Sequence, residues 1–171
     1  MLSSTHILSS RRVSRLTAVF AAVAALFVAT NARAQAPQFS PGALAWADGA
    51  CSICHNSIGQ GGVTGEAPKG PDLWRTRLTR DQIKETIACG RENTGMPYHV
   101  VGAYEKRACY GKPLGAVPNN VDNGAEFTEE QIETLVAFLW DNVVGKGPIT
   151  KAKCALFFGN NLSNPVCGSF P

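Results

Sequence analysis

Two cysteines and a histidine stand together in the sequence Cys51-Ser-Ile-Cys54-His55. Four chemistries fit this pattern. The first is covalent attachment of haem, in which two thiols add to the two vinyl groups of the porphyrin and the adjacent histidine binds the iron. The others are a zinc site, a thioredoxin-like redox pair, and a structural disulfide next to an unrelated histidine.

The surroundings of the motif favour haem attachment. A zinc site usually takes four ligands, often as two pairs, and the sequence has no second Cys-x-x-Cys or His pair. A thioredoxin-like pair follows a strand in a βαβ pattern, whereas an alanine-rich stretch with helical character precedes Cys51. The predicted cofactor is therefore one covalent haem c, attached through Cys51 and Cys54, with His55 as an iron ligand.

A haem that only passes electrons needs a second axial ligand, and His and Met are the usual choices. After the predicted leader described below, the chain has one methionine, Met96, and two histidines, His55 and His99. We favour Met96, because Gly95 lets the backbone approach the ring and Pro97 stiffens the loop. His99 is the alternative ligand, and otherwise we expect it at the surface or near a haem propionate.

The first 34 residues are typical of a secretory signal peptide. Arg11, Arg12 and Arg15 precede an apolar run at residues 16–30, and Ala32-Arg33-Ala34 forms a small-x-small cleavage site. The apolar run is short for a membrane span, which needs about 20 residues. The sequence therefore predicts export to the periplasm, cleavage after residue 34, and no membrane span in the mature protein. The alternative is an N-terminal anchor that is not cleaved.

Export also changes the charge balance. Of the 16 Lys and Arg residues, four lie in the predicted leader, which has no acidic residue, so 12 remain against 13 acidic residues. This balance gives no reason to predict nucleic-acid binding. Basic residues gather in residues 69–91 and acidic ones in residues 122–141. Either these are two solvated faces, or they form a dipole that orients docking onto a redox partner.

Three helices are expected to position the site. Each begins with a hydroxyl side chain that can cap it, followed by a proline or by a glutamine that completes a capping box. The third helix carries one apolar stripe between residues 132 and 143. The expected starts are Ser40-Pro41, Thr79 with Gln82, and Thr128 with Gln131.

The rest of the chain reads as loop. Residues 91–127 are rich in Gly, Pro and Asn, with room for a short helix around residues 99–106. A loop of this length should be functional or cross-linked. We identify no convincing strand, and no clear element in residues 146–171. The predicted fold class is all-α with much loop.

The chain resembles a class I c-type cytochrome. The matching residues are the Cys51–His55 motif, Gly70-Pro71-Asp72-Leu73, Gly95-Met96-Pro97 and the last amphipathic helix. The resemblance covers about residues 41–144. It implies a cytochrome c fold whose first and last helices cross beside the haem. It also implies a hydrogen bond from the His55 Nδ1–H to the Pro71 carbonyl, packing of Leu73 on the porphyrin, and a place for Trp74 near a propionate.

The remaining cysteines are Cys89, Cys109, Cys154 and Cys167, which allow three pairings. We favour Cys89–Cys109 and Cys154–Cys167, because each pair is near in sequence and closes a region without regular structure. The first would clamp the loop that presents Met96. Intermolecular pairing through the tail is an alternative.

The predicted organisation is a signal peptide at residues 1–34, a monohaem cytochrome domain at 35–145 and a disulfide-stapled C-terminal extension at 146–171. The resulting hypothesis is a periplasmic electron carrier, and not an enzyme, that exchanges electrons with redox proteins. One alternative is a dedicated haem subunit of a periplasmic dehydrogenase complex. Another is a haem enzyme or gas sensor, which needs a vacant or displaceable sixth position on the iron.

Overall fold

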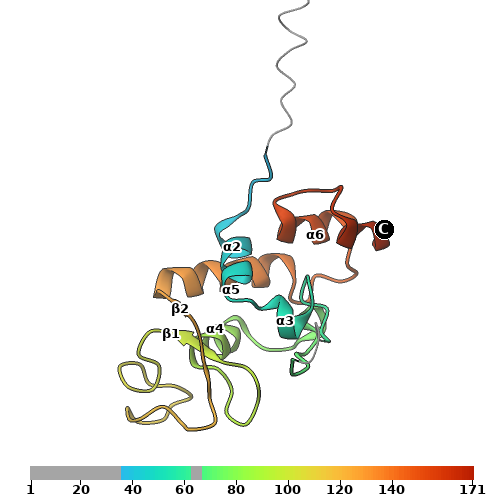
Figure 1. Cartoon of the computed structure of the whole chain (residues 1–171). Helices are drawn as coiled ribbons and strands as arrows, with labels where there is room; N and C mark the ends of the chain where they lie inside the picture. Colours follow the sequence, from blue (N-terminus) through green and yellow to red (C-terminus); the bar gives the residue numbers. More distant parts are fainter. Residues whose placement is uncertain (1–35, 63–66) are drawn as a thin grey trace, which may run out of the picture. The chain divides into compact units, whose positions relative to one another are not determined.

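The structure is a computed structural model that describes residues 36–62 and 67–171. The chain divides into one unit at Met1–Ala36 and a second at Pro37–Pro171, and the second unit contains every element discussed below (Figure 1). The predicted signal peptide lies outside the described residues. Within the described part, no helix has the length and apolar character that crossing a membrane requires.

The three expected helices are present, and each begins at its expected N-cap. α2 spans Pro41–Asp48, α4 spans Arg80–Cys89 and α5 spans Glu129–Asn142. Both capping boxes form: Thr79 accepts from the Gln82 N–H and Thr128 from the Gln131 N–H, each at 3.2 Å. These caps satisfy N–H groups that the first helical turn leaves without partners.

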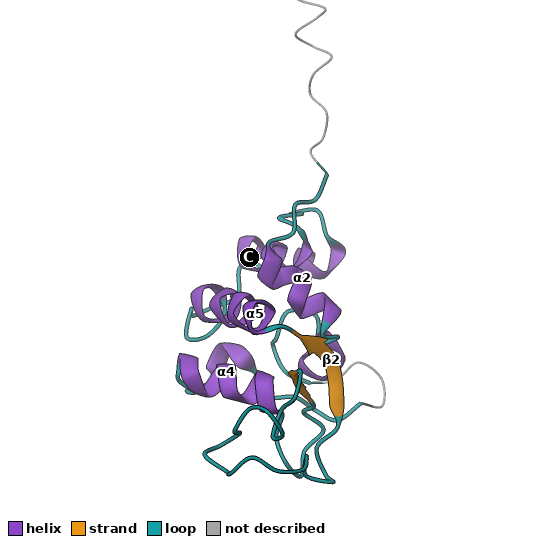
Figure 2. Ribbon diagram, turned by 90° about the vertical axis from the view of Figure 1, so that its left-hand side faces the viewer, coloured by secondary structure: helices purple, strands orange, loops and turns teal. Residues whose placement is uncertain are grey.

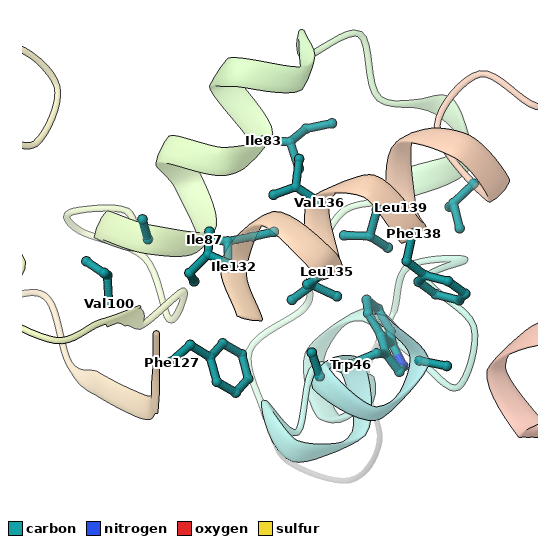
Figure 3. Close-up of a cluster of buried hydrophobic side chains, with 14 of the residues drawn as sticks. Trp46, Ile83, Ile87, Val100, Phe127, Ile132, Leu135, Val136, Phe138 and Leu139 are labelled. Atoms are coloured by element: carbon teal, nitrogen blue, oxygen red, sulfur yellow. The ribbon is translucent and has the colours of Figure 1, made fainter. Parts of the chain in front are cut away.

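Helices α2 and α5 cross in close contact, and buried apolar side chains fill the space between them (Figure 3). Gly42 makes the crossing close, because a Cβ atom there would lie 2.2 Å from the Phe138 Cβ. The apolar stripe of α5 is buried as its period predicts. Of the expected stripe, Trp140 is only partly buried, and Phe138, which the stripe did not include, is buried as well. The stripe residues that are buried are Ile132, Leu135, Val136, Leu139 and Val143.

The all-α prediction is wrong, because the fold also contains a small parallel sheet (orange in Figure 2). Strand β1 spans Tyr98–Val100 and pairs with β2, Asn123–Phe127. The helix expected around residues 99–106 is absent from this described stretch, where β1 is followed by turns. The pairing of two segments distant in sequence has overridden weak local preferences. The class is therefore mixed, with helices and a two-stranded sheet.

Residues 146–171 contain three elements that no pattern in the sequence predicts. α6 spans Lys151–Ala155, and the 3₁₀ helices η2 and η3 span Leu156–Phe158 and Pro165–Ser169. The Cys154–Cys167 disulfide links α6 to η3. This segment packs on α2 through η2, so it is part of the folded unit.

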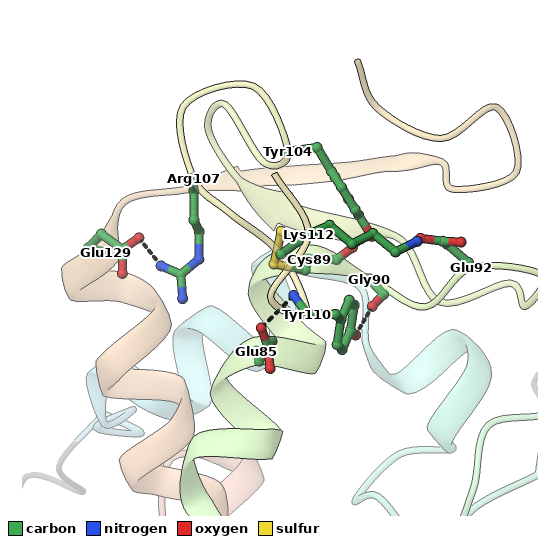
Figure 4. Close-up of a disulfide and its surroundings, with 10 residues drawn as sticks. Glu85, Cys89, Gly90, Glu92, Tyr104, Arg107, Tyr110, Lys112 and Glu129 are labelled. Carbon is green, nitrogen blue, oxygen red and sulfur yellow. Dashed lines mark hydrogen bonds and ion pairs between the residues drawn. A yellow bond between two sulfur atoms is a disulfide. The ribbon is translucent and has the colours of Figure 1, made fainter. Parts of the chain in front are cut away.

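The second disulfide joins Cys89, at the end of α4, to Cys109 (Figure 4). Both disulfides have the pairing favoured from the sequence. Around Cys89, the Tyr104 hydroxyl donates to the Cys89 carbonyl at 2.9 Å and the Tyr110 hydroxyl donates to the Gly90 carbonyl. The Tyr110 N–H also donates to the Glu85 carboxylate of α4 at 2.7 Å. The irregular segment after β1 is thus anchored to α4 by one covalent bond and three hydrogen bonds.

Candidate functional site

The motif residues lie on α3, a single turn at Ser52–His55 that follows α2. The Cys51 N–H donates to the Trp46 carbonyl at 3.3 Å, and the His55 N–H donates to the Cys51 carbonyl at 3.0 Å. The turn stops at Asn56, whose φ of 63° lies outside the helical region. Cys51, Cys54 and His55 therefore come from one short turn, and all three line the same cavity.

This cavity has a volume of about 580 Å³, which falls in the range of small-molecule and cofactor sites. Apolar side chains from helices α4 and α5 form part of its wall. The sequence-predicted residues Pro71, Leu73 and Met96 line it together with the motif. Residues that were not predicted to line it include Ile83, Ile87, Gly124, Leu135 and Leu139.

The geometry of His55 suits a metal ligand. Its Nδ1–H donates to the Pro71 carbonyl at 3.0 Å, which leaves Nε2 as the nitrogen with a free lone pair. Burial lowers the pKa of His55, and the hydrogen bond to Pro71 opposes that shift. The neutral imidazole is the form that binds metals.

Gly70 allows the Pro71 loop to approach the motif. A Cβ atom at this position would lie 2.7 Å from both the Cys54 carbonyl oxygen and the His55 Nδ1. The Gly70 N–H donates to that same Cys54 carbonyl at 2.7 Å. The expected contact between His55 and Pro71 therefore depends on a glycine directly before the proline.

The two motif cysteines are free thiols with partly buried side chains. Burial raises the pKa of Cys51 to about 12, with a smaller contribution from nearby Cys54. Reactive Cys-x-x-Cys redox pairs have a lowered thiol pKa instead. The environment of Cys51 is thus unlike that of a thioredoxin-like pair, whereas an uncharged thioether suits an apolar wall.

Met96 lies in the loop after α4, and hydrogen bonds to nearby residues hold its backbone. The Arg91 N–H donates to the Met96 carbonyl at 3.0 Å, and the Met96 N–H donates to the Thr94 hydroxyl oxygen at 3.1 Å. Gly95 packs against Pro68, where a Cβ atom would lie 2.5 Å from the proline ring. These contacts fix the backbone of Met96 at the cavity that His55 also lines.

His99, the alternative ligand, was expected at the surface or near a propionate. It is instead buried, with an exposed fraction of 3%. It lies on β1, its Nδ1–H donates to the Ala125 carbonyl at 2.9 Å, and its ring stacks on Phe127 at 5.3 Å between centroids. Burial lowers its pKa. A Cβ atom at Gly124 would lie 2.5 Å from the ring, so β2 accommodates His99 at the cavity wall.

Trp74, for which the resemblance implied a place near a propionate, does not belong to the described lining. Its ring is buried, and its Nε1–H donates to the Ile58 carbonyl at 2.8 Å. This hydrogen bond ties the loop after the motif to η1, Leu73–Arg75. Trp74 therefore does not line the cavity but stabilises the segment that carries Pro71 and Leu73.

The basic and acidic segments pair with each other across α4 and α5. Arg80 lies 2.9 Å from Glu133, and Lys84 bridges Glu133 and Glu129. Arg107 forms a further ion pair with Glu129. Because opposite charges meet, these pairs weaken the argument for a dipole that steers a partner.

Comparison of the chain with protein-family models, with curated proteins and with solved structures finds no match. Over residues 36–62 and 67–171, no three or more His, Cys, Asp or Glu side chains gather into a cluster that could hold a metal ion.

Proposed function

We propose that this chain is a periplasmic c-type cytochrome that carries single electrons through one covalently bound haem. The observation that carries the proposal is that Cys51, Cys54, His55 and Met96 all line one apolar cavity of cofactor size. The cavity fits the group chemically, because it combines two free thiols, an imidazole with a free Nε2 and a thioether.

Each residue has a distinct role in this proposal. Cys51 and Cys54 would attach the porphyrin, while His55 and Met96 would bind the iron. The Pro71 carbonyl orients the His55 ring and increases the basicity of Nε2. The bound haem supplies a one-electron couple, and neutral ligands with apolar surroundings favour its reduced form. Two protein ligands leave no coordination position for a substrate, which supports a carrier and not an enzyme.

The first test is the pigment itself. Acid–acetone should fail to extract haem from the purified mature protein, and a variant lacking both motif cysteines should lose covalent pigment. Extraction of all the haem from the wild type, or a colourless preparation from a host that matures c-type cytochromes, would contradict the proposal.

The second test assigns the sixth ligand. Oxidised class I c-type cytochromes have a far-red absorption band that reports methionine ligation. Met96→Ala should abolish this band and allow small ligands to bind, whereas His99→Gln should retain it. Absence of the band from the oxidised wild type, with small ligands admitted by His99→Gln and not by Met96→Ala, would show that His99 and not Met96 completes the site.

The same preparation separates the carrier from the alternative of a dedicated dehydrogenase subunit. A carrier should purify from its native periplasm as an isolated monomer at high salt, because transient redox partners dissociate. Co-purification of a dehydrogenase chain under these conditions would support the subunit instead.

A further inference from the structure

The C-terminal segment, defined here as residues 150–171, contacts the aromatic residue that neighbours the proposed iron ligand. Phe157 on η2 is 5% exposed and packs edge-on against Trp46, with 5.3 Å between ring centroids. It also packs edge-on against Phe138 of α5 at 4.9 Å. The Trp46 ring in turn lies 6.2 Å from the His55 ring. Phe157 of the C-terminal segment therefore packs against Trp46, the aromatic residue beside His55.

A second contact reaches Trp74, which lies on the same loop as Pro71, the hydrogen-bond partner of His55. The Lys153 ammonium lies 5.8 Å from the centre of the Trp74 ring, a distance at which cation–π attraction operates. The Trp74 Nε1–H donates to the Ile58 carbonyl, and the Leu73 N–H donates to the Gly59 carbonyl at 2.8 Å. These bonds hold the loop that begins at Pro71, whose carbonyl fixes the His55 ring.

The C-terminal segment is itself rigidly held, as positioning requires. Besides the Cys154–Cys167 disulfide, the Lys151 N–H donates to the Pro171 carbonyl at 2.6 Å. The Lys153 ammonium donates to the carbonyls of Lys146 and Pro148, which lie between α5 and α6. Both ends of the segment are thus tied down, and Phe157 and Lys153 have fixed places.

We propose that the C-terminal segment is a positioning element for His55, acting through Phe157 on Trp46 and through Lys153 on the Trp74–Pro71 loop. This inference rests on the proposed function, because it assigns His55 as the ligand whose orientation matters. Loss of the support lets the imidazole ring rotate and lets water approach it. The approach of water shifts the one-electron equilibrium toward the oxidised form, since burial favours the reduced one.

The experiment compares Phe157→Ala, Phe157→Leu and Lys153→Met with Leu162→Ala in the full chain. Leu162 lies in the same segment and is 53% exposed, so it controls for a general effect of tail substitution. The readouts are the g-values of the oxidised haem, which report ligand orientation, the equilibrium with a redox mediator, and the urea midpoint. Nuclear Overhauser contacts between the Trp46 and His55 rings provide a readout that does not need the haem.

We expect Phe157→Ala to change the g-values and to shift the mediator equilibrium toward oxidation, because solvent exposure and the contacts around a ligand tune the potential. Phe157→Leu should restore most of the wild-type signal, Lys153→Met should give a smaller shift, and Leu162→Ala none. A lower urea midpoint with wild-type g-values and equilibrium would overturn the proposal, because the tail would then be only structural.

Failure of the proposed function is recognised separately, as haem that acid–acetone extracts or a protein without pigment. In that case the Trp46–His55 contacts still decide the positioning role: their loss in Phe157→Ala with retention in Leu162→Ala supports it, and unchanged contacts refute it. Should Phe157→Ala not fold, Phe157→Leu and Lys153→Met decide the question by the same measurements.

Discussion

Replacing Gly90 with alanine should move the loop that carries Met96. Gly90 ends α4 with φ 66° and ψ −164°, a region that essentially only glycine adopts. A Cβ atom here would lie 2.7 Å from the Pro97 carbonyl carbon and the Tyr98 nitrogen, and 2.8 Å from the Met96 carbonyl oxygen. All three atoms are backbone, so no side-chain rotation can relieve the overlap.

The expected cost has two parts. Holding alanine in this conformation costs on the order of 1–3 kcal/mol, and overpacking against neighbours adds about 1–3 kcal/mol. The cheapest relief is displacement of the Met96 segment, which would break the 3.0 Å hydrogen bond from the Arg91 N–H to the Met96 carbonyl. Gly90→Ala should therefore lower both the free energy of unfolding and the occupancy of methionine ligation.

Gly111→Ala is the matched control. Gly111 has φ 68°, but a Cβ atom there meets nothing within 4 Å, so the substitution costs only the left-handed conformation, about 1–2 kcal/mol. Urea unfolding should show Gly90→Ala to be the less stable variant by at least about 1 kcal/mol. Only Gly90→Ala should weaken the far-red band of the oxidised protein. Equal midpoints and equal bands in the two variants would refute the argument that Gly90 leaves room for the ligand loop.

The helix starts were predictable from the sequence because capping is local. Thr79 and Thr128 each lie three residues before the glutamine that completes the box, and the reciprocal hydrogen bonds form within that short stretch. The period of α5 likewise identified its buried face. Such features depend on residues that are neighbours in sequence, and tertiary packing reinforces them here.

The proposed haem-attaching and iron-binding residues could be predicted from the sequence, but the other residues that line the cavity could not. The motif names Cys51, Cys54 and His55, and composition leaves Met96 as the one methionine after the predicted leader. Gly124 and Leu139 come from distant segments, and no local pattern assigns them to the same cavity. The burial of His99 follows from the pairing of β1 with β2, which its own sequence does not predict.

The sheet and the tail were missed for physical reasons. Strand β2, with the sequence NGAEF, contains Gly and Asn and no β-branched residue, so only its partner makes it a strand. Helix α6 has five residues, too few for an apolar period to emerge. The tail is held by a disulfide and by packing on α2, which are contacts between distant residues. Its contact with Trp46 could therefore be found only in three dimensions.

Three further substitutions or reactions follow from the same contacts. Gly42→Ala should lower the thermal unfolding temperature, because the 2.2 Å approach of a Cβ atom to Phe138 outweighs the gain in helix propensity, which is about 1 kcal/mol; an unchanged or higher temperature would mean that α2 and α5 separate freely. Replacing Cys89 and Cys109 together by serine should cost about 3 kcal/mol in urea unfolding, since the disulfide closes a loop of 20 residues. In folded protein prepared without haem, Cys51 should react with iodoacetamide near pH 8 at least about tenfold more slowly than an ordinary thiol. Burial raises its pKa from 9.0 to about 12 and only the thiolate reacts, although the higher pKa makes the remaining thiolate more nucleophilic. Mass spectrometry of the labelled peptide measures this rate, and a urea-unfolded sample is the control, in which Cys51 should recover ordinary reactivity. Equal rates in the folded and unfolded samples would show that the cavity wall does not shield this thiol from water.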